Sequence, residues 1–218
     1  GTTCLNCTAG TYLNTTGNDA LSDCIACVAG KYSDVDGSPS GTTCLECIAG
    51  KYLDTTGNDA ETDCLLCAEG KYSATPGITS GDSCQNCSRG TYLETQGNDA
   101  LSDCVDCAEG KYSEVDGSPS GTTCLNCTAG TYLESTGNDD SNNCVNCGAG
   151  KYSEVDGSPS GTTCLNCTAG TYLNTTGNAA PSDCIACPAG KYSFVDGSTT
   201  ITTCLQCIAG KYLDTTGN

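Results

Sequence analysis

The sequence has no histidine, methionine or tryptophan, and Phe194 is its one phenylalanine. Without histidine no ordinary pair of nucleophile and base can be assembled, and no phosphate-binding glycine loop follows a strand pattern. We therefore expect no catalytic residues and no enzyme activity. Because large apolar side chains are so few, we also expect that the 218 residues do not build one hydrophobic core.

Basic residues are scarce too, with 8 Lys and Arg against 26 Asp and Glu and a formal net charge of −18. Such a charge excludes nucleic acid and anionic membrane surfaces as expected partners. No apolar run approaches the length of a membrane span, so we expect no direct membrane insertion of this segment. No initiator Met or signal peptide is present, and we expect a mature segment or a piece of a longer chain.

Cysteine, glycine and tyrosine carry the pattern that is present. Two cysteines two residues apart are followed by Gly and Tyr, first at Cys4, Cys7, Gly10 and Tyr12, and the pattern returns every twenty residues. All 22 cysteines fall into such pairs, and each of the 11 tyrosines lies five residues after the second cysteine. A further glycine recurs from Gly17 onward. A short fixed period of this kind indicates eleven tandem repeats of about twenty residues.

Two kinds of repeat alternate, which gives a true period of forty. The odd repeats resemble residues 1–20, with Leu after Tyr, and the even repeats resemble residues 21–40, with Asp before the first Cys and Ser after Tyr. We therefore divide the chain into five repeat pairs and one partial repeat: 1–40, 41–80, 81–120, 121–160, 161–200 and 201–218.

The residue pattern predicts a small disulfide-rich, β-poor fold. The Gly-x-Tyr segment has strand character, Gly and Asp-Gly turns surround it, and no window has a helical period. We expect short strands or hairpins and turns without helices, in an elongated array in which each repeat touches only its neighbours. Each Tyr should lay its ring on a neighbouring disulfide or aliphatic residue. Apolar packing should come from Tyr, the aliphatic residue between the cysteines, such as Leu5, and the Leu after Tyr in odd repeats.

The cysteine content, about one residue in ten, is typical of disulfide frameworks and implies an oxidising, extracellular or cell-surface location. Spacing alone does not prove the pairing. A bridge within one CxxC leaves the long loop unconstrained, and bridges Cys4–Cys24 and Cys7–Cys27 cannot be repeated along the chain without skipping. We favour the second Cys of each repeat joined to the first Cys of the next, which leaves Cys4 and Cys207 to pair outside the segment. The favoured bridges are Cys7–Cys24, Cys27–Cys44, Cys47–Cys64, Cys67–Cys84, Cys87–Cys104, Cys107–Cys124, Cys127–Cys144, Cys147–Cys164, Cys167–Cys184 and Cys187–Cys204.

Metal binding is the main alternative for the cysteines. Consecutive CxxC pairs have the spacing of a four-cysteine zinc site. The acidic charge, the lack of His and the odd number of equivalent pairs favour disulfides instead. The string Asp34-Val-Asp36-Gly37 resembles a calcium loop but has too few carboxylates, and a plain turn is favoured. We expect no metal site and no cofactor.

Six Asn-x-Ser/Thr sequons lie in the odd repeats and predict N-linked glycans, and the Ser- and Thr-rich turns suit O-linked sugars. Four of the sequons have a cysteine in the middle, where rapid bridging blocks transfer, so Asn14 and Asn174 are the better candidates. The six sequon asparagines are Asn6, Asn14, Asn86, Asn126, Asn166 and Asn174.

The pattern CxxC, three residues and Gly-Thr/Lys-Tyr resembles the ephrin-receptor-like cysteine-rich repeat, a relative of the epidermal-growth-factor and tumour-necrosis-factor-receptor modules. In that group the first Cys of the CxxC bridges backward and the second forward. The Pro that often follows the second Cys there is found here only at Pro188. The resemblance implies an extracellular, elongated module of receptors and of long surface proteins of protists, some of which build flagellar hairs.

Because the repeats are so uniform, we expect a structural extracellular glycoprotein, a disulfide-stapled rod in a fibre, stalk or flagellar-hair-like appendage. Self-association, other fibre proteins and glycans are the expected partners. A receptor or adhesion ectodomain that binds a protein ligand is the alternative, and a tandem zinc-binding array is the second.

Overall fold

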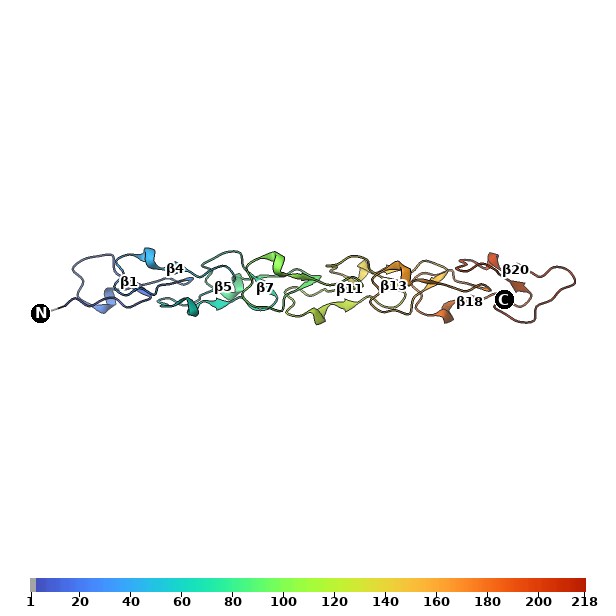
Figure 1. Cartoon of the computed structure of the whole chain (residues 1–218), viewed down its shortest axis with the longest axis horizontal. Helices are drawn as coiled ribbons and strands as arrows, with labels where there is room; N and C mark the ends of the chain where they lie inside the picture. The colour runs from blue at the N-terminus through green and yellow to red at the C-terminus, as the bar shows by residue number, and fades with distance from the viewer. Residues whose placement is uncertain (1–2) are drawn as a thin grey trace. The chain divides into compact units, whose positions relative to one another are not determined.

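The computed structural model describes residues 3–218 and consists of very short strands, 3-10 turns and loops (Figure 1). Ten strands carry the repeated tyrosines: β1 (Thr11–Tyr12), β3 (Lys31–Tyr32), β5 (Lys51–Tyr52), β7 (Lys71–Tyr72), β9 (Thr91–Tyr92), β11 (Lys111–Tyr112), β13 (Thr131–Tyr132), β15 (Lys151–Tyr152), β17 (Thr171–Tyr172) and β19 (Lys191–Tyr192). Ten more lie between the cysteines of a pair: β2 (Ile25–Ala26), β4 (Leu45–Glu46), β6 (Leu65–Leu66), β8 (Gln85–Asn86), β10 (Val105–Asp106), β12 (Leu125–Asn126), β14 (Val145–Asn146), β16 (Leu165–Asn166), β18 (Ile185–Ala186) and β20 (Leu205–Gln206).

A 3-10 turn of three residues precedes the first cysteine of each repeat from the second onward. These are η1 (Leu21–Asp23), η2 (Gly41–Thr43), η3 (Glu61–Asp63), η4 (Gly81–Ser83), η5 (Leu101–Asp103), η6 (Gly121–Thr123), η7 (Ser141–Asn143), η8 (Gly161–Thr163), η9 (Pro181–Asp183) and η10 (Ile201–Thr203). No α-helix occurs between residues 3 and 218. The expected disulfide-rich array of short hairpins without regular helices is therefore confirmed.

Local side chains explain why these turns form in both kinds of repeat. In four of the even repeats an aspartate caps the turn, as where Asp23 Oδ2 accepts the Ala20 N–H at 3.2 Å. Before an odd repeat a serine does so, as where Ser40 Oγ accepts the Thr42 N–H at 3.2 Å. The aspartate thus accepts the N–H of the residue before the turn, and the serine accepts the N–H of the second residue of the turn, so each kind of repeat pairs a different backbone donor at the start of its turn.

The tyrosine strand of one repeat pairs with the cysteine strand of the next. In β1 and β2 the strands are antiparallel, with Thr11 opposite Ala26 and Tyr12 opposite Ile25. On its other side Tyr12 forms a parallel bridge to Ser38 of the same following repeat. Tyrosine and threonine favour this extended, half-buried backbone, so the strand forms where their propensity predicts it.

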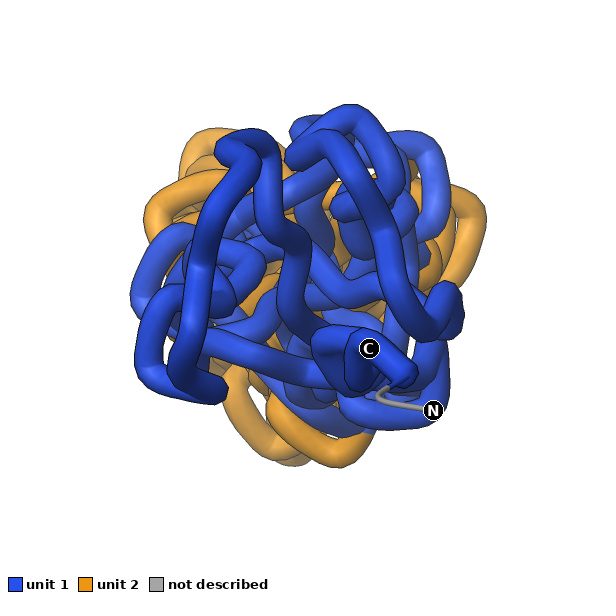
Figure 2. Tube along the Cα trace, turned by 90° about the vertical axis from the view of Figure 1, so that its left-hand side faces the viewer, with its two compact units in different colours: residues 1–105, 116–121 blue, residues 106–115, 122–218 orange. Residues whose placement is uncertain are grey.

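The chain forms two compact units, which are coloured separately in Figure 2. Unit 1 comprises Gly1–Val105 and Asp116–Gly121, and unit 2 comprises Asp106–Val115 and Thr122–Asn218. Strand pairs β1–β2, β3–β4, β5–β6 and β7–β8 lie in unit 1. Pairs β11–β12, β13–β14, β15–β16, β17–β18 and β19–β20 lie in unit 2.

Sulfur, leucine and serine fill the interior. From Cys7 to Cys187 the second cysteine of every repeat is at most 5% exposed. From Ser33 to Ser193 the residue after Tyr is also buried, whether it is Leu, as at Leu53 (2%), or Ser, as at Ser33 (0%). Tyr32 packs against the cluster of Cys47, Leu53 and Cys64, so at this position the tyrosine does lie on a disulfide and an aliphatic side chain as expected.

The expected burial of the aliphatic residue between the cysteines is wrong. Ile25 is 42% exposed, Leu45 50% and Leu65 46%, and Leu5 is 92% exposed. Both residues of each such strand are exposed, as in Ile25–Ala26 and Leu45–Glu46, while the cysteines that follow them, Cys27 and Cys47, are buried. The interior therefore takes the bridged sulfurs and leaves the aliphatic residue between the cysteines at the surface.

Candidate functional site: the disulfide-bonded repeat junction

Ten disulfides join successive repeats, and each connects the second Cys of one repeat to the first Cys of the next, seventeen residues later. The bridged pairs are the ten named in the sequence analysis, from Cys7–Cys24 to Cys187–Cys204. Their Cα atoms lie 5.6–5.9 Å apart, within the normal range for a disulfide. Each CxxC from the second repeat to the tenth is thus divided between two bridges. Cys4 and Cys207 are in no bridge within the described chain.

Four backbone hydrogen bonds accompany the first bridge, and two of them, from the Leu13 and Gly37 N–H groups, have equivalents at all ten junctions. The Gly10 N–H donates to Ser33 O at 2.7 Å and Gly10 O accepts the Cys27 N–H at 2.8 Å. The Leu13 N–H donates to Ser38 O at 2.9 Å, and the Gly37 N–H donates to Cys7 O at 2.7 Å. Bridge and hydrogen bonds together hold two repeats in one register, without requiring a large apolar core.

Glycine is required in this junction for two separate reasons. Gly10 has φ +81°, and a Cβ there would lie 2.2 Å from the carbonyl oxygen of Gly57, two repeats further on. A side chain would thus meet both backbone strain and a backbone clash. The same close approach joins Gly110 and Gly157 in unit 2, at 2.1 Å. Each repeat therefore also contacts the repeat that follows its immediate neighbour, whereas the sequence led us to expect contacts between immediate neighbours alone.

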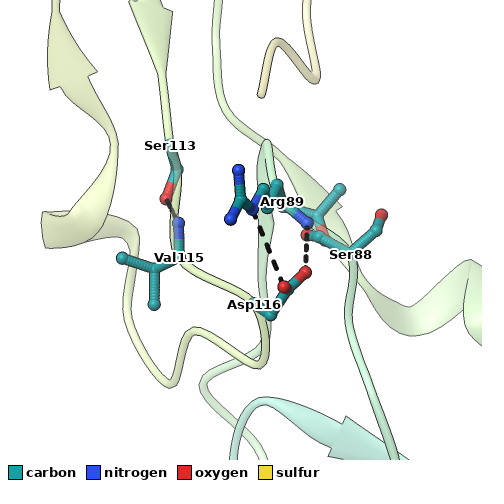
Figure 3. Close-up of polar contacts among 6 residues, drawn as sticks. Ser88, Arg89, Ser113, Val115 and Asp116 are labelled. Atoms are coloured by element: carbon teal, nitrogen blue, oxygen red, sulfur yellow. Dashed lines mark hydrogen bonds and ion pairs between the residues drawn. The ribbon is translucent and has the colours of Figure 1, made fainter. Parts of the chain in front are cut away.

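Acidic side chains contribute to the junction as hydrogen-bond acceptors. Asp36 Oδ1 accepts the Ala9 N–H of the preceding repeat at 2.8 Å. Asp156 and Asp196 accept backbone N–H groups twenty-seven residues earlier in the same way, at 2.8 and 2.7 Å. Figure 3 shows the variant at Asp116, which accepts the Arg89 N–H at 3.2 Å and lies 3.7 Å from Arg89 Nε.

The aspartate contact was missed by sequence reasoning, which interpreted Asp36 only as a turn residue or as part of a weak calcium motif. The sequence feature that could have indicated this contact is the Asp-Gly pair, which recurs at the same position in four even repeats. In each case the aspartate accepts a backbone N–H of the preceding repeat. In the fourth repeat Pro76 replaces this Asp. In the part of the chain that the structure describes, no group of three or more His, Cys, Asp or Glu side chains is arranged to hold a metal ion.

Buried serines were missed as well. In unit 2, Ser113 is 0% exposed and its Oγ accepts the Val115 N–H at 3.4 Å (Figure 3). Ser38 is 2% exposed, and its Oγ donates to Ser40 O at 3.0 Å. Composition alone assigned these serines to turns, because a small hydroxyl is common there.

Charge pairs add little to the junction. The ion pairs within residues 3–218 are Lys31–Glu46 at 3.4 Å, Lys51–Glu61 at 3.2 Å and Arg89–Asp116 at 3.7 Å. Most of their side chains are exposed by a third or more, and such pairs contribute about 0–1 kcal/mol each.

All six sequon asparagines are exposed. They nevertheless differ in position. Asn6, Asn86, Asn126 and Asn166 each rest against the left-handed glycine of the next repeat, as where Asn126 Oδ1 lies 2.8 Å from a Cβ built on Gly157. Asn14 and Asn174 lie instead in the loop that follows the tyrosine strand.

Comparison with known families agrees with this geometry. Residues 158–204, about a fifth of the chain, match the family described as tyrosine-protein kinase ephrin type A/B receptor-like. This part of the chain is thus an ephrin-receptor-like cysteine-rich sequence. The matched segment contains Cys167–Cys184 and Cys187–Cys204, two of the tandem bridges. No curated protein matches the chain significantly.

The chain is therefore an extracellular-type cysteine-rich repeat array, in which the repeated junction takes the place of a single site. No helix among residues 3–218 has both the length and the apolar character needed to cross a bilayer.

Proposed function

We propose that the protein is a structural extracellular glycoprotein, a disulfide-stapled rod within a fibre, stalk or flagellar-hair-like appendage. The observation that carries the proposal is the sameness of the junctions. Both units repeat one disulfide geometry and one set of backbone hydrogen bonds. Positions whose side chain varies between repeats, such as Asn14 and its equivalent Glu94, lie outside these disulfides and backbone hydrogen bonds.

Mechanical continuity follows from this arrangement. Each bridge is covalent, and each repeat is also hydrogen-bonded to the next, so a pulling force passes from repeat to repeat without relying on an apolar core. Lateral self-association or contact with other fibre proteins then completes the appendage. Glycans at Asn14 and Asn174 keep the rod hydrated, because both side chains are exposed in loops beside the junction.

One observation favours a receptor or adhesion stalk as the second candidate. Phe194 occupies the position held by Asp34, Glu114 and Glu154 in three other even repeats, is 82% exposed and lies 5.1 Å from the half-buried Tyr192 ring, measured between centroids. An exposed aromatic ring found in one repeat is the kind of anchor that binds a protein ligand.

Immunoelectron microscopy of the source cells with an antibody against the repeats tests the proposal. Label distributed along extracellular fibres or hairs supports the structural function. Label confined to the cell-body membrane contradicts it and favours the receptor. Labelling after treatment with a peptide N-glycosidase serves as the control for glycans that mask the epitope.

A further inference from the structure

Four even repeats carry an Asp-Gly pair, the aspartyl sequence most prone to isoaspartate formation: Asp36-Gly37, Asp116-Gly117, Asp156-Gly157 and Asp196-Gly197. In this reaction the glycine nitrogen attacks Cγ of the aspartate. A bond from N to Cγ forms and the bond from Cγ to one carboxyl oxygen breaks, and that oxygen leaves as water with the amide proton and one proton taken up from solvent. Water then opens the resulting succinimide at its backbone carbonyl and leaves an isoaspartyl linkage.

We infer that these four Asp-Gly pairs are latent sites of isoaspartate formation, and that the contacts made by the preceding repeat prevent the reaction while the junction is intact. Two bonds to that repeat engage the two reacting groups at every site. The Gly37 N–H, which must lose its proton, donates to Cys7 O at 2.7 Å, and Asp36 Oδ1 accepts the Ala9 N–H at 2.8 Å.

The same two contacts recur at the other three sites. The glycine N–H groups donate to Cys87 O at 2.8 Å, Cys127 O at 2.7 Å and Cys167 O at 2.7 Å. The aspartates accept from the N–H groups of Arg89, Ala129 and Ala169 at 3.2, 2.8 and 2.7 Å. The first of these aspartate contacts, at Asp116, is the longest, so Asp116 should be the least protected of the four sites.

Exclusion of solvent does not account for this protection. All four aspartates are exposed, so water for both steps of the reaction is always present. Two hydrogen bonds prevent the attack: one holds the peptide plane of the glycine and the other holds the carboxylate of the aspartate. Both must break before the glycine nitrogen can reach Cγ of the aspartate. The reaction then requires a local opening of the junction, and its rate falls in proportion to the population of the open form.

The experiment compares isoaspartate formation in the native chain and in the reduced, alkylated chain, incubated side by side for several weeks at neutral pH. Cleavage after lysine places each site in a different tryptic peptide: 32–51, 112–151, 152–191 and 192–211. Electron-transfer fragmentation distinguishes isoaspartate from aspartate in each. We expect the native chain to react more slowly by about tenfold or more at every site, since two hydrogen bonds must open. Equal rates in the two samples would overturn the inference.

A double variant, Cys7→Ser with Cys24→Ser, localises the effect. It removes the bridge at the junction that covers Asp36, while Asp116, Asp156 and Asp196 serve as internal controls. Faster reaction at Asp36 alone supports protection by the junction. Unchanged reaction at Asp36, or an equal increase at all four sites, contradicts it. The inference rests on the junction and not on the fibre role, so either can fail without the other.

Discussion

At Gly50 two backbone segments approach each other closely. A matched set of alanine substitutions can measure how much this contact contributes to the free energy of unfolding. Gly50 has φ +80°, and a Cβ there would lie 2.3 Å from Gly97 O and 2.8 Å from Gly97 C. Gly57, in the same unit, has φ +76°, but its nearest neighbour would be Ala26 Cβ at an ordinary 3.6 Å. Gly148 has no positive φ, and a Cβ there would meet nothing within 4 Å.

The magnitudes follow from these environments. Left-handed backbone costs an alanine about 1–2 kcal/mol, which is the whole effect expected for Gly57→Ala. In Gly50→Ala the carbonyl of Gly97 must also retreat by about 1 Å. That movement disrupts the bonds from Gly50 N–H to Ser73 O at 2.8 Å and from Gly97 N–H to Cys67 O at 2.9 Å. With about 1 kcal/mol for each bond, the expected total is about 3–4 kcal/mol. Gly148→Ala should be neutral or slightly stabilising.

Guanidinium denaturation with the disulfides intact, followed by near-ultraviolet circular dichroism of tyrosine, measures the overall change in the free energy of unfolding. Hydrogen exchange of the Gly97 amide gives the local value, which is needed because a repeat array does not have to unfold in one step. If Gly50→Ala and Gly57→Ala lower the unfolding free energy equally, then the contact between alternate repeats contributes nothing and the reasoning is refuted.

Three further predictions address the bridges, the interior and the shape. A thiol reductant should abolish the tyrosine near-ultraviolet signal while a chelator leaves it unchanged, and loss in chelator alone would show that the cysteines bind metal. Leu133 is 4% exposed and Leu125 is 54% exposed. Leu133→Ala should therefore lower the free energy of unfolding by about 2–4 kcal/mol, and Leu125→Ala by less than about 1 kcal/mol. Equal losses in denaturation would contradict the assigned interior. The elongated array predicted from the sequence should give a radius of gyration by X-ray scattering well above the compact-domain value of about 17 Å, and a result near that value would exclude it.

The sequence was sufficient for whatever depends on local chemistry. The invariant spacing of Cys7, Gly10 and Tyr12 predicted the repeat and the tyrosine strand, because each is decided by residues close together in the chain. The 3-10 turns were not anticipated, although Asp23 and Ser40, which cap them, define the two kinds of repeat.

Apart from the disulfides, the side-chain contacts between repeats were beyond sequence reasoning. The two-residue strand Ile25–Ala26 gives no alternation from which to tell its inner from its outer face, so Ile25 was assigned to the interior although it faces solvent. Asp36 was interpreted from its own turn, whereas its partner Ala9 lies twenty-seven residues earlier. Such partners become visible only when the relative placement of successive repeats is known.

The forty-residue period has a physical explanation in the interior, and Ser153 provides its test. Ser153 and Leu173 occupy equivalent places in successive repeats, and both are buried, at 0% and 2% exposure. Their backbones make the same bonds: Ser153 O accepts the Gly130 N–H and Leu173 O accepts the Gly150 N–H, both at 2.8 Å. The side chains differ in volume and in the Ser153 hydroxyl, which accepts the Val155 N–H at 3.4 Å. The alternation of small and large residues indicates that the interior holds one leucine for every two repeats.

Ser153→Leu should then overfill the interior and destabilise the array by about 1–3 kcal/mol. Ser153→Ala is the control, because it removes the same 3.4 Å bond from the Val155 N–H to Ser153 Oγ without adding volume, and should cost less than about 1 kcal/mol. Guanidinium denaturation and exchange of the Gly130 amide measure both effects. If Ser153→Leu is as stable as the native chain, the interior has room for a leucine in every repeat, and packing volume does not explain why the two kinds of repeat alternate.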